Sequence, residues 1–444
     1  MTAAVKVDRP NIIFILTDDQ RWDAVGYASD GKVHTPEIDR LARAGVRFDN
    51  AYVTTPISAA SRATLLTGMY ERTHGFTFQQ GPLKEPYMRQ AYPVILRQQG
   101  YITAYFGKLG VAYRNAAKLF DHAEIYDRND KEPSVKGYYR FDGQDSLHLT
   151  RYTGQRALEF IESYDGSAPF CMSLGFSAPH AHDPAPDQYF WMPVSDSLYE
   201  DQEMAPPILS EDYYFQILPQ EVREGFNRLR WTWRYDTPEK YQHSIKGYYR
   251  MIHDVDTEIG KIRAALEKKG LDKNTVIIFM GDNGYFLGER QLAGKWLMYD
   301  NCLRVPLVIY DPRGEHAEVK DMVLNIDIAS TILDVAHVSI PATYQGTSLL
   351  PYCYGKKHVV ERDSFLCEHL WEKKEIPSSE GLRTQRWKYM RYRFIPDSEE
   401  LYDLKKDPLE TKNLAGDPAY GKILKELREA CDAQIRYYTS LKLE

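Results

Sequence analysis

A serine and an arginine, four residues apart, begin a predicted helix within Thr54–Gly68 (TTPISAASRATLLTG). Pro56 ends the preceding extended segment, and the alanines and leucines that follow favour a helix. On one interpretation, Arg62 is a solvated side chain on the first turn. On the other, Ser58 lies at the helix N-terminus, where free backbone N–H groups attract an anion, and Arg62 lies on the same face. The stretch alone favours the first interpretation, whereas the second places a nucleophile beside an anion-binding cation.

Polar side chains also follow two apolar runs that read as strands. Asp18 and Asp19 follow NIIFIL, and Asp282 and Asn283 follow VIIFMG. In an open parallel sheet, ligands bind outside the carboxyl ends of the strands. Carboxylates held close together repel unless a cation lies among them, and all-oxygen ligands favour a hard cation, Ca²⁺ or Mg²⁺. The alternative is that these are ordinary turn residues, but two such pairs after two apolar strands favour the metal.

The segments that must position these residues alternate between strands and helices. Continuous apolar runs predict strands that are buried on both faces of a parallel sheet. The predicted strands are Asn11–Leu16, Thr103–Phe106, Phe170–Phe176 and Thr275–Met280, and the predicted helices are Pro36–Ala44, Tyr92–Gln99 and Lys246–Lys268. This alternation predicts an α/β fold.

Two regions depart from the alternation. Residues 184–238 are rich in Pro, Asp, Tyr and Trp, and they predict a long surface insertion of the kind that often builds substrate sites. The C-terminal region predicts short strands and a final helix, at Ser364–Cys367, Arg386–Tyr392, Glu400–Tyr402 and Tyr420–Tyr437. We therefore expect a large domain over residues 1–350, which includes the insertion, and a smaller α+β subdomain over residues 351–444.

Composition excludes several classes of protein. The 444 residues carry a net charge of -7 with scattered Lys and Arg, which argues against a nucleic-acid partner. Five distant cysteines without a C-x-x-C pair argue against a disulfide framework or a structural zinc site. There is no apolar run long enough for a membrane span. The first residues, MTAAVKVD, lack the apolar stretch of a secretory signal, which fits either a cytoplasmic protein or a chain whose signal is absent.

Several motifs, in this order and spacing, resemble the formylglycine-dependent sulfatases of the alkaline phosphatase superfamily. The resemblance covers nearly the whole chain, including the C-terminal subdomain. The motifs are Asn11–Asp19, Ser58–Arg62, Gly107-Lys108, Ala178–His180, Gly281–Gly284, Gly294-Lys295, Leu303–Pro306, Leu401–Leu404, Asp407-Pro408 and Asn413-Leu414.

The resemblance implies a large mixed sheet sandwiched by helices, with a small C-terminal subdomain that has a short antiparallel sheet and a helix. It also implies a role for each matched residue. Ser58 would be oxidised after translation to formylglycine, the nucleophile. The residues implied to hold a calcium ion together with Ser58 are Asp18, Asp19, Asp282 and Asn283. Those implied to act on the nucleophile or the sulfate ester are Arg62, Lys108, His180 and Lys295.

The chain departs from the family pattern at two places. The family commonly has a histidine two residues after the lysine that matches Lys108, and this chain has Gly110 there. His182 is near in sequence, but a loop histidine is more often solvated than catalytic. A second frequent family histidine is replaced by Arg290. The resemblance therefore does not indicate which residues form the part of the pocket that binds the substrate beyond its sulfate group.

The resemblance implies hydrolysis of sulfate esters on a sulfated carbohydrate. The serine form of the motif resembles bacterial enzymes that an anaerobic radical maturase modifies, which implies a periplasmic or secreted protein. Two other functions stay open: hydrolysis of phosphate mono- or diesters or phosphonates, and glycan binding without catalysis. The residues that we expect to contact the sugar are His182, Arg290, Glu368, His369 and Arg383, although each alone could instead form a surface salt bridge.

Overall fold

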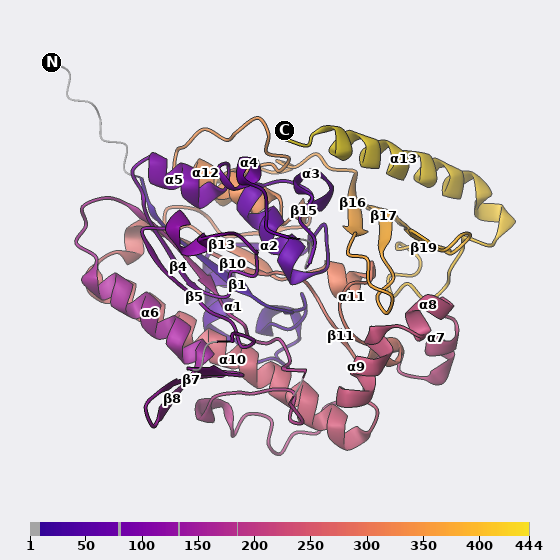
Figure 1. Cartoon of the computed structure of the whole chain (residues 1–444), viewed down its shortest axis with the longest axis horizontal. Coiled ribbons are helices and arrows are strands. Elements are labelled where there is room, and N and C mark those ends of the chain that lie inside the picture. The colour runs from indigo at the N-terminus through magenta and orange to yellow at the C-terminus, as the bar shows by residue number, and fades with distance from the viewer. Residues whose placement is uncertain (1–8, 79–80, 132–133, 184, 444) are drawn as a thin grey trace.

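The chain folds around one large mixed β-sheet that is covered by helices on both faces (Figure 1). The computed structural model describes residues 9–78, 81–131, 134–183 and 185–443. The first eight residues, on which the expectation about a signal segment rests, lie outside the described residues, as does Pro184 at the start of the expected insertion.

Eight strands form the large sheet, and most of them run in the same direction. β1 pairs in parallel with β10 on one side and β9 on the other, and β4 continues the parallel order to β5, whereas β13 runs antiparallel to its neighbours. In sheet order the strands are β14 (Ala317–Val319), β2 (Val46–Phe48), β13 (Leu307–Tyr310), β10 (Thr275–Gly281), β1 (Asn11–Thr17), β9 (Phe170–Gly175), β4 (Ile102–Gly107) and β5 (His122–Ile125).

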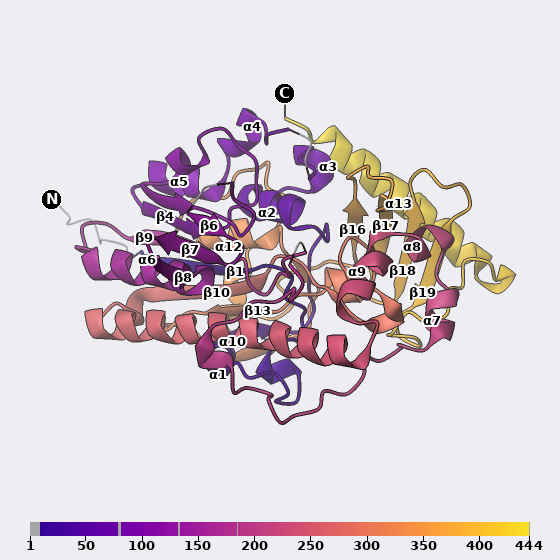
Figure 2. The ribbon, with the colours of Figure 1, turned by 60° about the horizontal axis from the view of Figure 1, so that its bottom comes forward.

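Side chains of β1 alternate between two hydrophobic cores. Ile12, Phe14 and Leu16 belong to one core, while Ile13 and Ile15 belong to the other. The first core is covered by α2 (Ser58–Thr67), α5 (Tyr92–Gln98) and α12 (Asp327–Val335), and the second by α1 (Pro36–Ala44), α6 (Leu149–Ser163) and α10 (Pro238–Lys269). The two groups of helices lie on opposite sides of the sheet in Figures 1 and 2.

A small antiparallel sheet and a long helix form the C-terminal region, drawn in orange and yellow in Figure 1. They are β16 (Ser364–His369), β17 (Ser379–Thr384), β18 (Trp387–Tyr392), β19 (Glu399–Asp403) and α13 (Gly421–Ser440). Phe365 and Leu401 of this sheet belong to the same hydrophobic core as Phe14 of β1. The predicted fold class is therefore confirmed, while the boundary between residues 350 and 351 stays a prediction.

The described part of the segment expected to be an irregular surface insertion contains three α-helices, which are α7 (Asp212–Gln216), α8 (Gln220–Arg223) and α9 (Phe226–Arg234). Trp, Thr and Asn are weak helix formers, so the sequence FNRLRWTWR of α9 gives little helical signal. α9 packs instead against β12. The remaining short elements are β3 (Ala51–Tyr52), α3 (Glu71–His74), α4 (Glu85–Met88), β6 (Val135–Lys136), β7 (Tyr139–Asp142), β8 (Asp145–His148), β11 (Phe286–Leu287), β12 (Ala293–Gly294), α11 (Asp300–Leu303) and β15 (Val323–Leu324).

Two expectations about composition also agree with the structure. All five cysteines lie buried in the described chain, and none of them forms a disulfide. Over the same residues, each helix is too short or too polar to cross a membrane.

A buried carboxylate of α10 caps the start of α1 on the face away from the first core. Asp256 accepts hydrogen bonds from the backbone N–H groups of Glu37 (3.1 Å) and Ile38 (2.7 Å), although Thr35, the N-cap residue, makes no side-chain cap. Helix α1 therefore depends on a distant residue for its N-terminal hydrogen bonds.

Replacing this carboxylate should destabilise the protein without changing its chemistry. Asp256→Ala removes the acceptor of the Glu37 and Ile38 N–H groups, so we expect the free energy of unfolding to fall by about 2 kcal/mol in urea titrations. Asp256→Asn keeps one acceptor oxygen and should lose less. Equal stability of the alanine variant and the wild type would contradict the capping role.

Candidate functional site

The ends of β1 and β10 bring the predicted carboxylates together. The Asp282 N–H donates to the Thr17 carbonyl at 2.9 Å, so the parallel pairing of β1 and β10 continues one residue past the end of β10. The Asp19 N–H donates to Asp282 Oδ1 at 3.1 Å, and Asn283 Nδ2 donates to Asp19 Oδ1 at 2.7 Å. All of these polar side chains are fully buried. The predicted meeting of the two strand ends is therefore what the structure shows.

The Ser58 hydroxyl lies within this cluster. Helix α2 begins at Ser58, and its N-cap residue is Ile57, so Ser58 does not cap the helix through its side chain. Its Oγ donates to Asp18 Oδ1 at 2.8 Å or to Asn283 Oδ1 at 3.2 Å, and it accepts from Lys295 Nζ at 2.7 Å. The hydroxyl is thus held by the side chains of Asp18, Asn283 and Lys295 rather than by the backbone N–H groups of the helix.

Three cations balance the three carboxylates. Arg62 Nε donates to Asp282 Oδ2 at 2.7 Å, Lys108 pairs with Asp18, and Lys295 Nζ lies 2.5 Å from Asp19 Oδ1. All three cations are buried. Isolated buried charges would be very costly, so their pairing is what makes the cluster stable.

The cations act unequally on the carboxyl groups. Burial alone would raise the pKa of Asp18, but Lys108 and Lys295 hold that pKa well below its ordinary value. The pKa of Asp282 is raised, because burial and the charge of Asp18 outweigh the attraction of Arg62. Asp18 is therefore more firmly ionised than Asp282, as an oxygen ligand of a cation should be.

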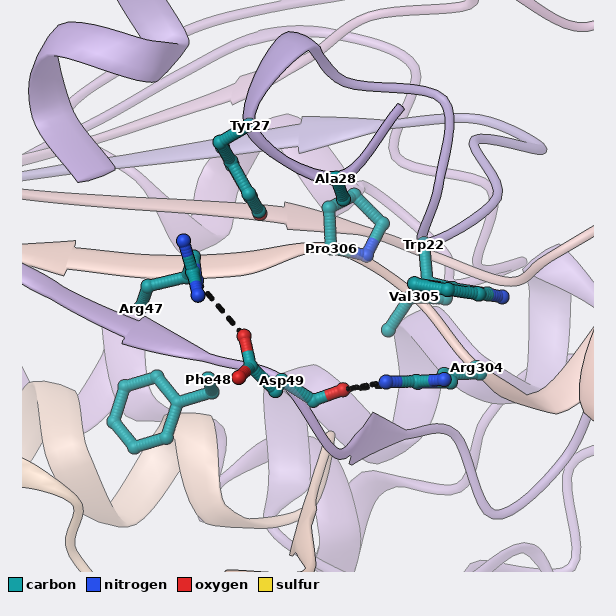
Figure 3. Close-up of a pocket in the computed structure, with 9 residues that line it drawn as sticks. All are labelled: Trp22, Tyr27, Ala28, Arg47, Phe48, Asp49, Arg304, Val305 and Pro306. Carbon is teal, nitrogen blue, oxygen red and sulfur yellow. Dashed lines mark hydrogen bonds and ion pairs between the residues drawn. The ribbon is translucent and has the colours of Figure 1, made fainter. Parts of the chain in front are cut away.

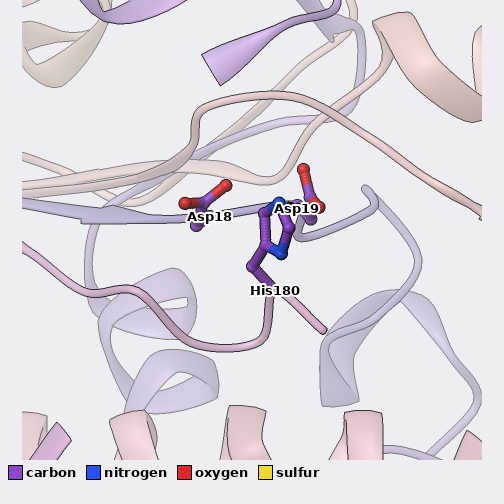
Figure 4. Close-up of side chains that lie close together, drawn as sticks. All are labelled: Asp18, Asp19 and His180. Atoms are coloured by element: carbon purple, nitrogen blue, oxygen red, sulfur yellow. Dashed lines mark ion pairs between the residues drawn. The ribbon is translucent and has the colours of Figure 1, made fainter. Parts of the chain in front are cut away.

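His180 approaches the cluster from the loop after β9 (Figure 4). Its Nε2 lies 3.4 Å from Asp19 Oδ2 and 3.1 Å from Arg128 NH2, while its Nδ1 lies 2.5 Å from the Ala181 carbonyl. The carbonyl can only accept, so we assign the proton to Nδ1, and Nε2 then accepts from Arg128. Burial and the charge of Arg128 lower the pKa of His180 well below its ordinary value, which keeps the ring neutral.

The donor set fits a hard cation. Asp18, Asp19 and His180 place one ligand atom each within 4.8 Å of one another. Asp19 Oδ2 is buried and has no hydrogen-bond partner among the described residues, so the charged oxygen has an unfilled position. With Asp282 and Asn283 beside them, oxygen atoms dominate the set, which suits Ca²⁺ or Mg²⁺ better than Zn²⁺.

The cluster forms the floor of a cavity of about 420 Å³. Ser58, Lys108, His180 and Lys295 all line it. The other lining residues are Ile57, Ala59, Phe78, Gly110, Asp127, Arg128, Asn129, Asp183, Phe226, Arg230, Trp296, Trp371, Lys373 and Ile376. They come from several segments that are distant in sequence, including the loop after α3, the loop after β5, α9 in the insertion and the β16–β17 connection.

Gly110, where the family commonly has a histidine, has no room for a side chain. Its φ is +70°, and a Cβ there would lie 2.7 Å from Arg62 Cδ. Arg62 fills the space, since its NH1 also donates to the Lys108 carbonyl at 2.5 Å. Arg128 supplies a further cation to the cavity, and it binds Asp127 at 3.2 Å and His180. Sequence reasoning missed Arg128, because its segment carries no motif.

Three of the five residues expected to contact the sugar bind other parts of the protein, and a fourth, His369, is buried away from the cavity. Arg290 donates to the Leu409 and Glu410 carbonyls, Glu368 pairs with Arg72, and Arg383 pairs with Asp300. The side chain of His369 is fully buried, and neither of its ring nitrogens has a hydrogen-bond partner in the described chain.

His182, the fifth of these residues, is half-buried and lies edge-on to Phe190. The described residues that line the cavity include none of the five. We therefore do not propose them as sugar contacts.

The residues that do line the mouth are aromatic and basic: Phe78, Phe226, Arg230, Trp371 and Lys373. Trp371 and Phe78 stack edge to face at 4.8 Å. In the sequence, only composition pointed to these residues, because the insertion and the segment around Trp371 are both rich in aromatic and charged residues. Their meeting depends on the fold, which composition does not specify.

A second cavity, of about 250 Å³, lies at β2 and the residues before β13 (Figure 3). Arg304 stacks over Trp22 at 3.8 Å and donates to the Asp49 carbonyl, while Arg47 pairs with the Asp49 carboxylate at 2.8 Å. The charged groups here bind one another. Among the described residues that line this cavity there is no predicted site residue.

Comparison with known proteins agrees with this geometry. The family model described as Sulfatase matches residues 10–338, and the model for the C-terminal domain of N-sulphoglucosamine sulphohydrolase matches residues 288–436. An N-acetylglucosamine-6-O-sulfatase of Bacteroides thetaiotaomicron is 30% identical, over 97% of this chain and 87% of its own length. An arylsulfatase of Clostridium perfringens is 26% identical, over 95% and 93%.

Solved structures share the fold. BT4656, in complex with its substrate D-glucosamine-2-N,6-O-disulfate, superposes with a TM-score of 0.81 and 25% identity, over 97% of this chain and 98% of that one. A phosphonate monoester hydrolase of Agrobacterium radiobacter gives a TM-score of 0.78 over 96% of each chain, and at 23% identity it shows the fold alone. With a family model that matches most of its length, the chain belongs to the sulfatase family, whose members are sulfuric ester hydrolases.

Proposed function

We propose that this sulfatase hydrolyses sulfate esters of a sulfated carbohydrate and that its nucleophile is formylglycine derived from Ser58. One observation carries the proposal: the Ser58 hydroxyl is held between Lys295 and a buried carboxylate cluster at the floor of the cavity. The relatives named for carbohydrate sulfates support the substrate class.

Ser58 is in position to be the attacking group. An unmodified hydroxyl is a weak nucleophile at neutral pH. The hydrated aldehyde supplies one hydroxyl that attacks sulfur and a second that later expels sulfate. Lys295 donates to the side-chain oxygen, and Asp18 accepts from it, so the chain orients this position from two sides.

We propose that Asp18, Asp19, Asp282 and Asn283 hold a calcium ion together with the side chain at position 58. The ion would supply positive charge beside the ester oxygens, where negative charge increases during the reaction. Asp19 Oδ2, which is buried without a partner, supports this assignment.

The remaining cations surround the place where the sulfate group would lie. Lys108, Arg128 and Lys295 all line the floor of the cavity, and we propose that they bind the ester oxygens. His180 lies between Arg128 and Asp19, and its neutral ring accepts from Arg128, so we propose that it orients this arginine. Arg62 donates to Asp282 and to the Lys108 carbonyl, so it holds helix α2, and with it Ser58, against the carboxylates.

The aromatic walls suit a saccharide. Sugar rings present apolar C–H faces together with polar edges, and aromatic side chains offer flat apolar surfaces to them. Trp296 and Phe226 line the cavity next to Ile57, so a ring that enters beside them reaches the nucleophile.

We also propose that a radical maturase of the anaerobic type modifies Ser58 and that the protein works in the periplasm or outside the cell. The serine in the motif supports the first proposal. The bacterial carbohydrate sulfatases among the relatives support the second.

Release of sulfate tests the function directly. The purified protein, made together with a serine-type maturase, should release sulfate from 4-nitrophenyl sulfate at least about a hundredfold faster than it releases phosphate from 4-nitrophenyl phosphate. Faster hydrolysis of the phosphate, or of a phosphonate ester, would favour a phosphoester or phosphonate hydrolase. Binding of sulfated sugars without any hydrolysis would favour a non-catalytic protein.

The modification of Ser58 should be visible by mass spectrometry. Protein made without the maturase should carry plain serine and turn over almost nothing, while Ser58→Cys made with a cysteine-type maturase should carry the aldehyde and be active. Ser61→Ala, in the same helix and bonded to Asn325, is the matched control and should keep its activity. High turnover by protein that is proven to hold unmodified serine would refute the proposed nucleophile.

Calcium should stabilise the protein through the carboxylate cluster. After chelation and dialysis, Ca²⁺ at a hundredfold excess over its Kd should stabilise the fold by about 2.7 kcal/mol, seen as a rise in Tm. Asp19→Asn should abolish this rise, whereas Asp201→Asn, at an exposed position, should not change it. An equal rise in wild type and Asp19→Asn would exclude the proposed site.

Removing the Arg128 guanidinium should impair turnover. Arg128→Gln should lower kcat/KM for 4-nitrophenyl sulfate by about ten- to a hundredfold, because a cation is lost where negative charge increases. Arg128→Lys keeps the charge and should recover part of the loss. The exposed Arg114→Gln is the control. Wild-type kinetics for Arg128→Gln would remove this residue from the mechanism.

A further inference from the structure

In the wall of the cavity around α9, positively charged side chains outnumber the carboxylates that pair with them. Asp183 pairs with both Arg230 and Arg234, so one carboxylate serves two guanidinium groups. Burial would raise the pKa of Asp183, but the two arginines lower it to about 2. Even with Asp183 fully ionised, one positive charge of this trio remains unbalanced.

Arg230 is buried, yet part of its guanidinium is unsatisfied. Its side chain is 6% exposed, and it lines the cavity. NH2 donates to Asp183, whereas Nε and NH1 have no hydrogen-bond partner among the described residues. Buried donors of this kind are costly unless a ligand or water accepts from them.

A second cation lies against the same aromatic ring. Arg230 Cζ is 5.2 Å from the centroid of Phe226, and Lys373 Nζ is 5.0 Å from that centroid. Lys373 is exposed at the mouth of the cavity, and it forms no ion pair in the described part of the chain. Two cations lie against one ring, and the counter-ion of Arg230 is shared with Arg234, so this wall favours an anion.

This wall is separate from the place where the ester sulfate would lie, but it is close enough for one ligand to reach both. Trp296 connects them, because it directly follows Lys295 and also stacks under Arg230 at 4.5 Å. The backbone N–H of Trp296 donates to the carbonyl of Pro56 at 3.0 Å, and Pro56 lies two residues before Ser58. Its indole Nε1 is buried and has no hydrogen-bond partner among the described residues.

We propose that Arg230 and Lys373 bind a second oxyanion of the substrate, a sulfate or a carboxylate, while the scissile sulfate lies at Ser58. The inference rests on the proposed function and refines it: the preferred substrate is a saccharide that carries at least two anionic groups. Trp296 and Phe226 form the apolar surface between the two anion sites.

Binding to a Ser58→Ala variant tests this inference without turnover. The probes are glucosamine 6-O-sulfate, glucosamine-2-N,6-O-disulfate and an unsaturated uronyl-glucosamine 6-O-sulfate, measured by calorimetry at low salt. We expect at least one dianionic probe to bind about tenfold more tightly than the monosulfate, with the preference decreasing as salt is added. Tighter binding of the disulfate identifies a sulfate at the second site, and tighter binding of the uronyl compound identifies a carboxylate.

Substitutions of Arg230 and Lys373 test whether these two residues cause the preference for dianionic probes. Lys373→Gln and Arg230→Gln, each in the Ser58→Ala background, should lower the ratio of the monosulfate Kd to the dianion Kd by about fivefold or more. Lys374→Gln changes the neighbouring exposed lysine, which does not line this cavity, and should leave the ratio unchanged. If Arg230→Gln does not fold, Lys373→Gln still decides, because its side chain is exposed.

The outcomes separate this inference from the proposed function. A ratio near one in the parent, or an unchanged ratio in Lys373→Gln, overturns the second anion site even if the modified wild type releases sulfate from the monosulfate. Absence of sulfate release from every probe by the modified wild type would overturn the proposed function, whereas the binding ratios would still show whether the second site exists.

Discussion

Buried like charges at the ends of two adjacent parallel strands are the constraint on which this structure depends. Asp18 and Asp282 are fully buried and adjacent, and the protein must compensate for their repulsion. It does so with Arg62, Lys108 and Lys295, each delivered by a different element. Helix α2, the end of β4 and the segment after β12 are thereby tied to the sheet through charge as well as through apolar packing. The same ties hold the Ser58 hydroxyl.

The floor of the site could be predicted from the sequence because its residues follow strands with a strong apolar pattern. The continuous apolar runs NIIFIL and VIIFMG are typical of buried strands. Parallel pairing places the carboxyl ends of these strands at the same edge of the sheet. The helix at Ser58 was likewise clear from local propensity. These features depend on local sequence and on one rule of sheet geometry. The family resemblance added roles for the residues but not their contacts.

The walls could not be predicted, because they depend on where distant loops meet. Helix α9 has weak helical propensity, and it is stabilised by packing against β12 and its neighbouring helices. Arg128 lies in a segment without a motif, and Arg230 gains its importance from Asp183 and Trp296 rather than from its neighbours in sequence. Conversely, Arg290, Glu368 and Arg383 looked like ligand-binding residues in sequence, but polar groups elsewhere in the chain bind them. Such pairings are a property of tertiary structure.

The distance in sequence between the two strand ends determines when the site can close during synthesis. Asp19 and Asp282 are 263 residues apart, so the cluster that buries Ser58 cannot form until β10 has left the ribosome. At ~5–20 residues per second, the growing chain exposes Ser58 for tens of seconds. In the finished fold, Ser58 is only 6% exposed, at the bottom of a cavity. If Ser58 is modified as proposed, the modifying enzyme has its best access to the nascent chain, and fast folding of the C-terminal half would compete with that modification.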